Sequence, residues 1–205
     1  NNGVSVSSAG DVNGDGFADL LTGAFLADGL DNLRSASGES YLIYGGNGFT
    51  SSVTHLGTSA AETLTGTSAA NVMVGGRGND IMLGNGGADV LTGGEGDDVL
   101  AVSDLTFARI FGGNGFDTLR LDGSGLNLDL TSLADNRIQG IEQIDITGSG
   151  INTLTLNYRE VLNISDESKR LIVRRNGGDV VNIGSGWTQG ADQLIGSDNF
   201  QTYTQ

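Results

Sequence analysis

Hydrophobic and polar positions recur every nine residues in the middle of the chain. Residues 75–101 read GGRGNDIML, GNGGADVLT and GGEGDDVLA. Each unit has a glycine-rich turn, an Asp at its sixth position and then three apolar or small residues, a run too short for a helix and typical of a short strand. The pattern predicts a flattened solenoid of parallel strands, in which two units make one coil and positions eighteen residues apart stack.

Stacking brings acidic side chains together. Asp80 and Asp98 are eighteen residues apart, so we expect their carboxylates on neighbouring coils, separated by the roughly 4.8 Å between adjacent strands. Two carboxylates at this distance repel each other unless a cation lies between them. The glycine turns leave backbone carbonyls to complete an all-oxygen site, which suits calcium.

These units resemble the RTX, or haemolysin-type, nonapeptide repeat GGxGxDxUx, which forms a calcium-binding parallel β-roll. Residues 75–80 and 93–98 match the first six positions fully, residues 84–89 match with Asn85 in place of the second glycine, and a later copy lies at 112–117. A glycine-rich flexible linker would not keep Asp at position six of four units with hydrophobic residues behind it.

The roll has a predicted set of calcium ligands. Side-chain ligands stand at position six of successive units, and backbone ligands at positions one and three of the glycine turns. The set is Glu62, Asn71, Asp80, Asp89, Asp98 and Asp117, with Gly75, Arg77, Gly84, Gly86, Gly93, Glu95, Gly112 and Asn114.

The predicted sites differ in quality. Residues 57–74 form two degenerate units that carry Glu62 and Asn71 at position six. Asp117 lies nineteen residues from Asp98, a slip that one bulged residue can absorb. We therefore expect the best-formed site between Asp80 and Asp98.

A different calcium loop lies near the start of the chain. Residues 11–19 read DVNGDGFAD, with oxygen side chains at positions 1, 3, 5 and 9 and Gly at 6, as in EF-hand loops. The flanking residues 20–23 and 41–44 read as strands instead of helices. An Asx-rich surface turn without an ion is the alternative interpretation.

This loop and its flanks resemble one FG-GAP repeat, a family that forms blades of integrin-type β-propellers with calcium in the loop. The resemblance covers residues 6–24 and 38–46. It implies that the ligands are the side chains of Asp11, Asn13, Asp15 and Asp19 and the carbonyl of Phe17.

The chain after residue 120 stays strand-rich but loses the nonapeptide. Alternating apolar residues predict strands at 126–130, 141–146, 154–156, 171–173 and 180–183, and residues 158–164 predict one helical turn. We expect an all-β chain divided into an FG-GAP-like calcium-loop unit (1–46), a connector (47–56), a calcium-stabilised parallel β-roll (57–120) and a β-rich solenoid continuation or cap (121–205). The last part is similar to the region that follows the repeats in very large secreted bacterial adhesins.

Composition supports cation binding. Gly accounts for 35 of 205 residues, Pro and Cys are absent, and the formal net charge is −15. Excess acid argues against nucleic-acid partners, and no segment approaches the roughly 18 apolar residues of a membrane span. Because the chain has no Cys, we expect several calcium ions to replace disulfides as the stabilising links outside the cell.

Function is predicted from these parts together. A single histidine, His55, and no Cys, GxSxG or HExxH motif argue against an enzyme. The resemblance implies a calcium-binding structural module of an RTX adhesin, secreted or at the bacterial cell surface, exported by type I secretion machinery and folding on calcium outside the cell. The alternatives are a calcium-dependent module that recognises a glycan or a protein, and an accessory region of a secreted RTX hydrolase. Trp187 is a candidate for stacking on a sugar, with a core aromatic of the cap as the alternative. The basic residues Lys169, Arg170, Arg174 and Arg175 are a candidate docking patch for the acidic calcium region, with a solvated strand face as the alternative.

Overall fold

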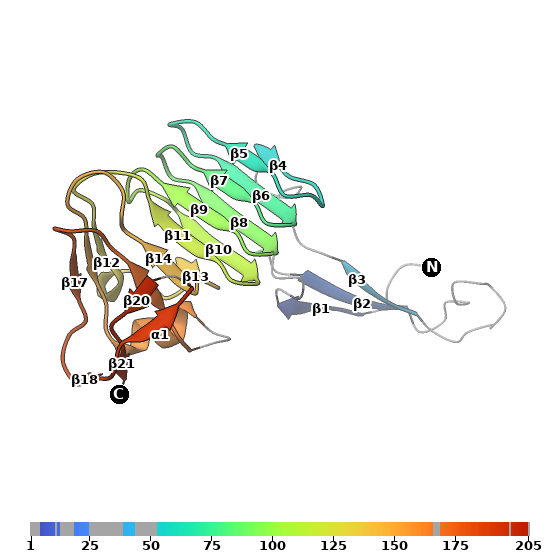
Figure 1. Ribbon diagram of the computed structural model, residues 1–205. Helices are drawn as coiled ribbons and strands as arrows, with labels where there is room; N and C mark the ends of the chain where they lie inside the picture. The colour runs from blue at the N-terminus through green and yellow to red at the C-terminus, as the bar shows by residue number, and fades with distance from the viewer. Residues whose placement is uncertain are drawn as a thin grey trace.

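The computed structural model describes residues 5–10, 12, 19–24, 39–43, 53–165, 169–196 and 198–204. Near the N-terminus, β1 (Ser5–Gly10), β2 (Asp19–Ala24) and β3 (Glu39–Ile43) form an antiparallel sheet with β2 in the centre (Figure 1). The strands predicted at 20–23 and 41–44, after the calcium loop, therefore correspond to β2 and β3.

Two parallel sheets make up the roll, and successive strands along the chain alternate between them (Figure 1). The first sheet contains β4 (His55–Leu56), β6 (Val72–Arg77), β8 (Val90–Glu95), β10 (Arg109–Asn114) and β13 (Ile138–Gln139). The second contains β5 (Thr63–Thr65), β7 (Ile81–Leu83), β9 (Val99–Val102), β11 (Thr118–Leu121), β14 (Gln143–Asp145) and β16 (Ile172–Arg174). This is the predicted two-strand coil.

The register of the strands follows the nonapeptide. Ile81 pairs with Val99, an offset of eighteen residues, as predicted. In the next coil Thr118 pairs with Val99, and β10 pairs with β8 at the same offset of nineteen, without a shift inside either pair. The extra residue therefore lies in the connection between β9 and β10. The prediction of a bulged strand residue is wrong, because β10 and β11 carry the same offset.

The core of the roll contains a row of side chains from each sheet. A three-residue strand turns its central side chain to one face and its neighbours to the other. The inward residues are fully buried: Met73, Leu91 and Ile110 in the first sheet, Met82, Leu100 and Leu119 in the second. All of them except Ile110, which lies between two repeats, come from position eight of the nonapeptide. The apolar position of the nonapeptide thus supplies most of these rows, and Val102, Phe107 and Leu121 are also buried in the core.

After β11 the coils widen and gain a third parallel sheet. This sheet contains β12 (Asn127–Asp129), β15 (Thr153–Thr155) and β17 (Val180–Asn182), and the coils also include a 3-10 turn, Leu130–Ser132, and α1 (Tyr158–Ile164). Because β14 and β16 still pair in parallel with the second sheet of the roll, the solenoid continues. The five predicted strands and the predicted helical turn are all present, with strand ends shifted by a few residues.

Two antiparallel pairs follow the last coil. β18 (Thr188–Gln189) pairs with β21 (Tyr203–Thr204), and β19 (Gln193–Ile195) pairs with β20 (Asp198–Phe200). The Arg174 guanidinium of β16 lies 5.6 Å from the ring centre of Phe200. The parallel stacking therefore ends in hairpins.

The side chains considered for recognition make contacts within the chain. Trp187 packs edge-on against Tyr158, with ring centres 6.4 Å apart, and its indole nitrogen donates to the carbonyl of Ile183. Arg174 donates to Gln143, and Arg175 donates to the carbonyl of Asp179. Both kinds of residue thus hold the wide coils together.

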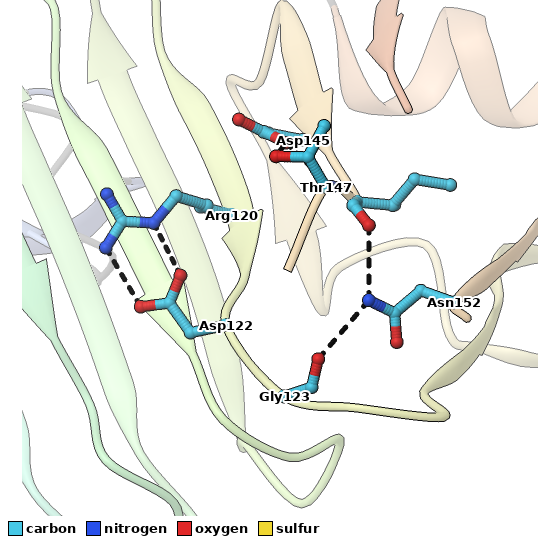
Figure 2. Close-up of polar contacts among 7 residues, drawn as sticks. Arg120, Asp122, Gly123, Asp145, Thr147 and Asn152 are labelled. Atoms are coloured by element: carbon cyan, nitrogen blue, oxygen red, sulfur yellow. Dashed lines mark hydrogen bonds and ion pairs between the residues drawn. The ribbon is translucent and has the colours of Figure 1, made fainter. Parts of the chain in front are cut away.

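Asn152 links two neighbouring coils in the widened part. Its amide nitrogen donates to the carbonyls of Gly123 and Ile146, at 3.3 and 3.1 Å (Figure 2), and its amide oxygen accepts from the Leu126 backbone at 2.9 Å. The side chain is fully buried. It supplies hydrogen bonds that backbone groups at irregular turns otherwise lack.

We expect Asn152→Ala to lower the free energy of unfolding by roughly 3 kcal/mol, because several buried backbone groups lose their partner. Asn182→Ala is the matched control: Asn182 is exposed and donates only to Thr155 Oγ1 among the bonds described, so its effect should stay within about 0.5 kcal/mol. Urea unfolding in calcium, followed by circular dichroism, measures both. Equal effects would contradict the role given to Asn152.

Candidate calcium sites

One edge of the roll carries a continuous column of acidic side chains, which we call the acid ladder. In it, the backbone nitrogen of one acid donates to the carboxylate of the acid on the next coil. The ladder runs Glu62, Asp80, Asp98, Asp117 and Glu142, with N···O distances of 2.9, 2.8, 2.8 and 2.9 Å. Each Asp of the ladder thus uses its Oδ1 to hold the coil before it.

The other oxygens of the three Asp side chains have no such partner. Oδ2 of Asp80, of Asp98 and of Asp117 is buried and accepts no hydrogen bond, and the residues are 1%, 1% and 0% exposed. A buried carboxylate oxygen without a partner is costly. A bound cation would supply the missing interaction at each of these positions.

A glycine leaves room beside each unpaired oxygen. A Cβ on Gly75 would lie 2.6 Å from Asp80 Oδ2 and 2.5 Å from the carbonyl oxygen of Gly93 on the next coil. At Gly93, the same space is bordered by Asp98 Oδ2 and the Gly112 carbonyl. The first glycine of the nonapeptide is therefore required where a carboxylate and a carbonyl converge.

Burial also changes the protonation of the ladder. It raises the pKa of Asp98 to about 6 and that of Asp117 to about 8, and the neighbouring carboxylates add to the effect. The pKa of Asp80 is raised for the same first reason. Without a cation, the interior of the ladder therefore favours neutral acids.

The ligand chemistry fits calcium. Among the residues described, no three His, Cys, Asp or Glu side chains cluster as a metal site. A cation in the ladder would therefore take many of its ligands from backbone carbonyls, an oxygen set that calcium accepts.

The predicted backbone ligands separate into two groups. Carbonyls of the position-one residues Gly75, Gly84, Gly93 and Gly112 each border the space beside a glycine on the preceding coil. Position three shows other contacts. Arg77 and Glu95 form an exposed ion pair at 3.2 Å, the Asn114 carbonyl accepts from Gly96 at 2.9 Å, and Gly86 lies against the Asp104 side chain. The position-three carbonyls remain predicted ligands only.

The opposite edge of the roll has fewer acids. The Asn71 backbone donates to Asp89 Oδ1 at 2.8 Å, and Asp89 Oδ2 borders Gly84. Burial raises the pKa of Asp89. In the next coil, the residue in register with Asp89 is Ala108, so this column ends where the nonapeptide is interrupted.

The degenerate first coil has threonine at position two of each unit, where three of the four later units have glycine. Both carboxylate oxygens of Glu62 accept hydrogen bonds from Thr58, at 2.7 and 2.8 Å, and Asn71 Oδ1 accepts from Thr67 at 2.7 Å. These side chains have protein donors in place of a cation. The interactions agree with the weaker sites expected there.

Sequence reasoning missed Gly140 and Glu142 at the far end of the acid ladder. One sequence signal could have identified Glu142 as part of the ladder. It stands immediately before the strand Gln143–Asp145, as Asp117 stands immediately before β11. The spacing from Gly140 to Glu142 is two residues instead of the five found in the nonapeptide, which hid the correspondence.

The N-terminal loop is described only in part. Asp11, Asn13, Asp15 and Phe17 lie outside the described residues. Asp19 begins β2 and is fully buried, and its Oδ2 accepts from the Val12 backbone at 2.6 Å. It therefore joins the described end of the loop to the sheet.

We expect Gly75→Ala to remove one bound calcium ion, because the added methyl group would take the space between Asp80 Oδ2 and the Gly93 carbonyl. Forcing the methyl group in should also cost about 1–3 kcal/mol. Gly177→Ala is the control, since no atom lies within 4 Å of a Cβ there. Calcium stoichiometry by equilibrium dialysis tests the pair, and unchanged stoichiometry in Gly75→Ala would exclude this position as a site.

The raised pKa values of Asp98 and Asp117 predict that the folded fraction of the chain depends on pH in chelator and much less in calcium. Both are raised from 3.8, so in chelator their contribution to stability is full below about pH 4 and is lost as the pH rises through 6 and 8. Calcium binds the ionised carboxylates, so in calcium the folded fraction should be retained at high pH. Circular dichroism between pH 4 and 9 measures this. A folded fraction in chelator that rises with pH would disprove the assignment.

Comparison with known families agrees with this geometry. A model of the RTX calcium-binding nonapeptide repeat, in four copies, matches residues 56–91 and 65–100, and a model of the FG-GAP repeat matches residues 2–43. Searches of curated proteins and of solved structures found no match. The chain therefore contains a set of RTX calcium-binding nonapeptide repeats, preceded by an FG-GAP repeat.

Proposed function

We propose that residues 57–120 are a calcium-dependent structural β-roll of a secreted RTX adhesin, which folds when calcium binds outside the cell. RTX repeats bind calcium and are typical of secreted bacterial proteins, and both families are structural modules. The observation that carries the proposal is the row of buried Oδ2 atoms of Asp80, Asp98 and Asp117, which have no partner within the chain.

Those oxygens link folding to calcium. In the folded roll without calcium, the ladder carboxylates are buried one coil apart, so ionising them costs free energy through desolvation and mutual repulsion. A cation that binds only the folded state stabilises it in proportion to the logarithm of its concentration above the dissociation constant. Folding and ion binding are then one equilibrium, as in other small metal-dependent domains.

This equilibrium suits a protein that crosses a membrane before it folds. At the low calcium concentration of the cytosol the acidic repeats stay unfolded, the form that we assign to export by type I secretion machinery. Millimolar calcium outside then drives folding. No helix in the described part of the chain has the length and apolar character of a membrane span.

The remaining parts have proposed supporting roles. We assign residues 1–46 to the FG-GAP-like unit, 47–56 to a connector and 121–205 to a continuation that covers the end of the roll. An open solenoid end is an unpaired sheet edge that invites association, and the hairpins after β17 interrupt further parallel pairing. The adhesin assignment rests on the similarity of this last part to the region after the repeats in large secreted adhesins.

A calcium titration tests the proposal. We expect the wild-type chain to lose most of its β-sheet signal in chelator and to regain it in millimolar calcium. Asp80→Ala with Asp98→Ala should raise the calcium midpoint about tenfold or more, since the ligand charge is lost. The matched pair Glu62→Ala with Asn71→Ala should shift it less, because those side chains already have threonine donors. A chain that is fully β-structured in chelator would refute folding on calcium.

A further inference from the structure

We propose that the row of calcium sites extends beyond the nonapeptides, and that its last ion is held between Asp117 of the roll and Gly140 of the first wide coil. Glu142 positions Asp117 for this ion. Calcium would then join the repeats to the β-rich continuation. The inference rests on the proposed function, because it assumes that the unpaired Asp oxygens of the ladder bind calcium.

Strand register places the two coils together. Ile110 pairs with Ile138 and Phe111 with Gln139, which sets Gly112 beside Gly140. In the second sheet, Thr118 pairs with Gln143, which sets Asp117 beside Glu142. The wide coil therefore presents a glycine and an acid at the two places where the nonapeptide coils present theirs.

The space beside Gly112 repeats the arrangement found in the coils before it. A Cβ there would lie 2.5 Å from Asp117 Oδ2 and would also meet the carbonyl oxygen of Gly140. The corresponding pairs are Asp80 Oδ2 with the Gly93 carbonyl, and Asp98 Oδ2 with the Gly112 carbonyl. Gly140 thus takes the place of the first glycine of a repeat, although its coil has no nonapeptide.

Glu142 takes the place of the repeat's Asp. Its Oε2 accepts from the Asp117 backbone at 2.9 Å, as Asp117 Oδ1 accepts from Asp98 at 2.8 Å. The wide coil has only two residues from Gly140 to Glu142, where the nonapeptide has five. The longer side chain of glutamate makes the same contact from this shorter turn.

Asp117 has the side chain that requires a ligand. It is fully buried, and its Oδ2 has no hydrogen-bond partner. Oxygen donors from a carboxylate and a carbonyl favour a hard cation such as calcium.

The proposed ion would act on the whole continuation. Gly140 and Glu142 flank Ile141, whose backbone donates to the carbonyl of Ile164 at the end of α1 at 3.0 Å. The Ile172 backbone of β16 donates to the carbonyl of Glu142 at 2.8 Å. Calcium binding at Asp117 should therefore order residues 138–146 together with the roll.

Three variants of the full chain test the proposal, with calcium alone as the probe. Asp117→Asn should bind one ion fewer than wild type in equilibrium dialysis. Glu142→Gln keeps an acceptor for the Asp117 backbone but loses a charge, and should weaken one ion about 10- to 100-fold. Asp145→Asn is the control, because it removes the same charge three residues away and its Oδ1 only caps Thr147 among the bonds described.

Hydrogen exchange supplies a second measurement that does not depend on a variant folding. In the wild type, residues 138–146 should gain protection with calcium in parallel with residues 112–121. If Asp117→Asn fails to fold, calcium binding by Glu142→Gln and this exchange measurement still test the site between Asp117 and Gly140.

The outcomes separate the two proposals. Wild-type calcium binding with unchanged stoichiometry and affinity in Asp117→Asn and Glu142→Gln would overturn the extended site and leave the proposed function standing. The extended site would also be overturned if hydrogen-exchange protection of residues 138–146 did not depend on calcium while that of residues 72–102 did. If the wild-type chain binds no calcium, the proposed function itself fails.

Discussion

The structure depends on one electrostatic constraint, the stacking of buried carboxylates at intervals of one coil. Oδ1 of each ladder Asp accepts a backbone hydrogen bond from the coil before it, so the acids cannot be removed without loosening the stack. Oδ2 of Asp80, Asp98 and Asp117 is buried and accepts no hydrogen bond. A cation that neutralises the negative charge would stabilise the stacked coils, and the proposed function rests on this effect.

The glycines and the apolar residues of the repeat both allow the carboxylates to stack. The first glycine of each unit leaves space where a carboxylate meets a carbonyl of the next coil, and side chains such as Met82 and Leu100 fill the interior between the sheets. Since each strand of the roll contributes only one or two residues to it, the apolar core is narrow. A narrow core gives limited hydrophobic stabilisation, and ions can supply what a larger core or disulfides supply elsewhere.

Wider coils take over where the nonapeptide ends. Hydrogen-bonding side chains such as Asn152 and Trp187 replace the regular ladder there. Glu142 connects the nonapeptide coils to the wide coils, because it belongs to a wide coil and still accepts the ladder hydrogen bond from the Asp117 backbone. The change from the acid ladder to other side-chain hydrogen bonds thus occurs within one coil.

The sequence alone determined the two-strand coil, the eighteen-residue stacking and the inward position of residues such as Leu91, because period and polarity specify them locally. It also located α1 and the five later strands. Only the tertiary structure decided that the extra residue before Asp117 enters a turn, that Arg77 pairs with Glu95, and that Gly140 and Glu142 continue the ladder. Those features depend on which residues meet across coils of unequal length, and no spacing along the chain encodes that.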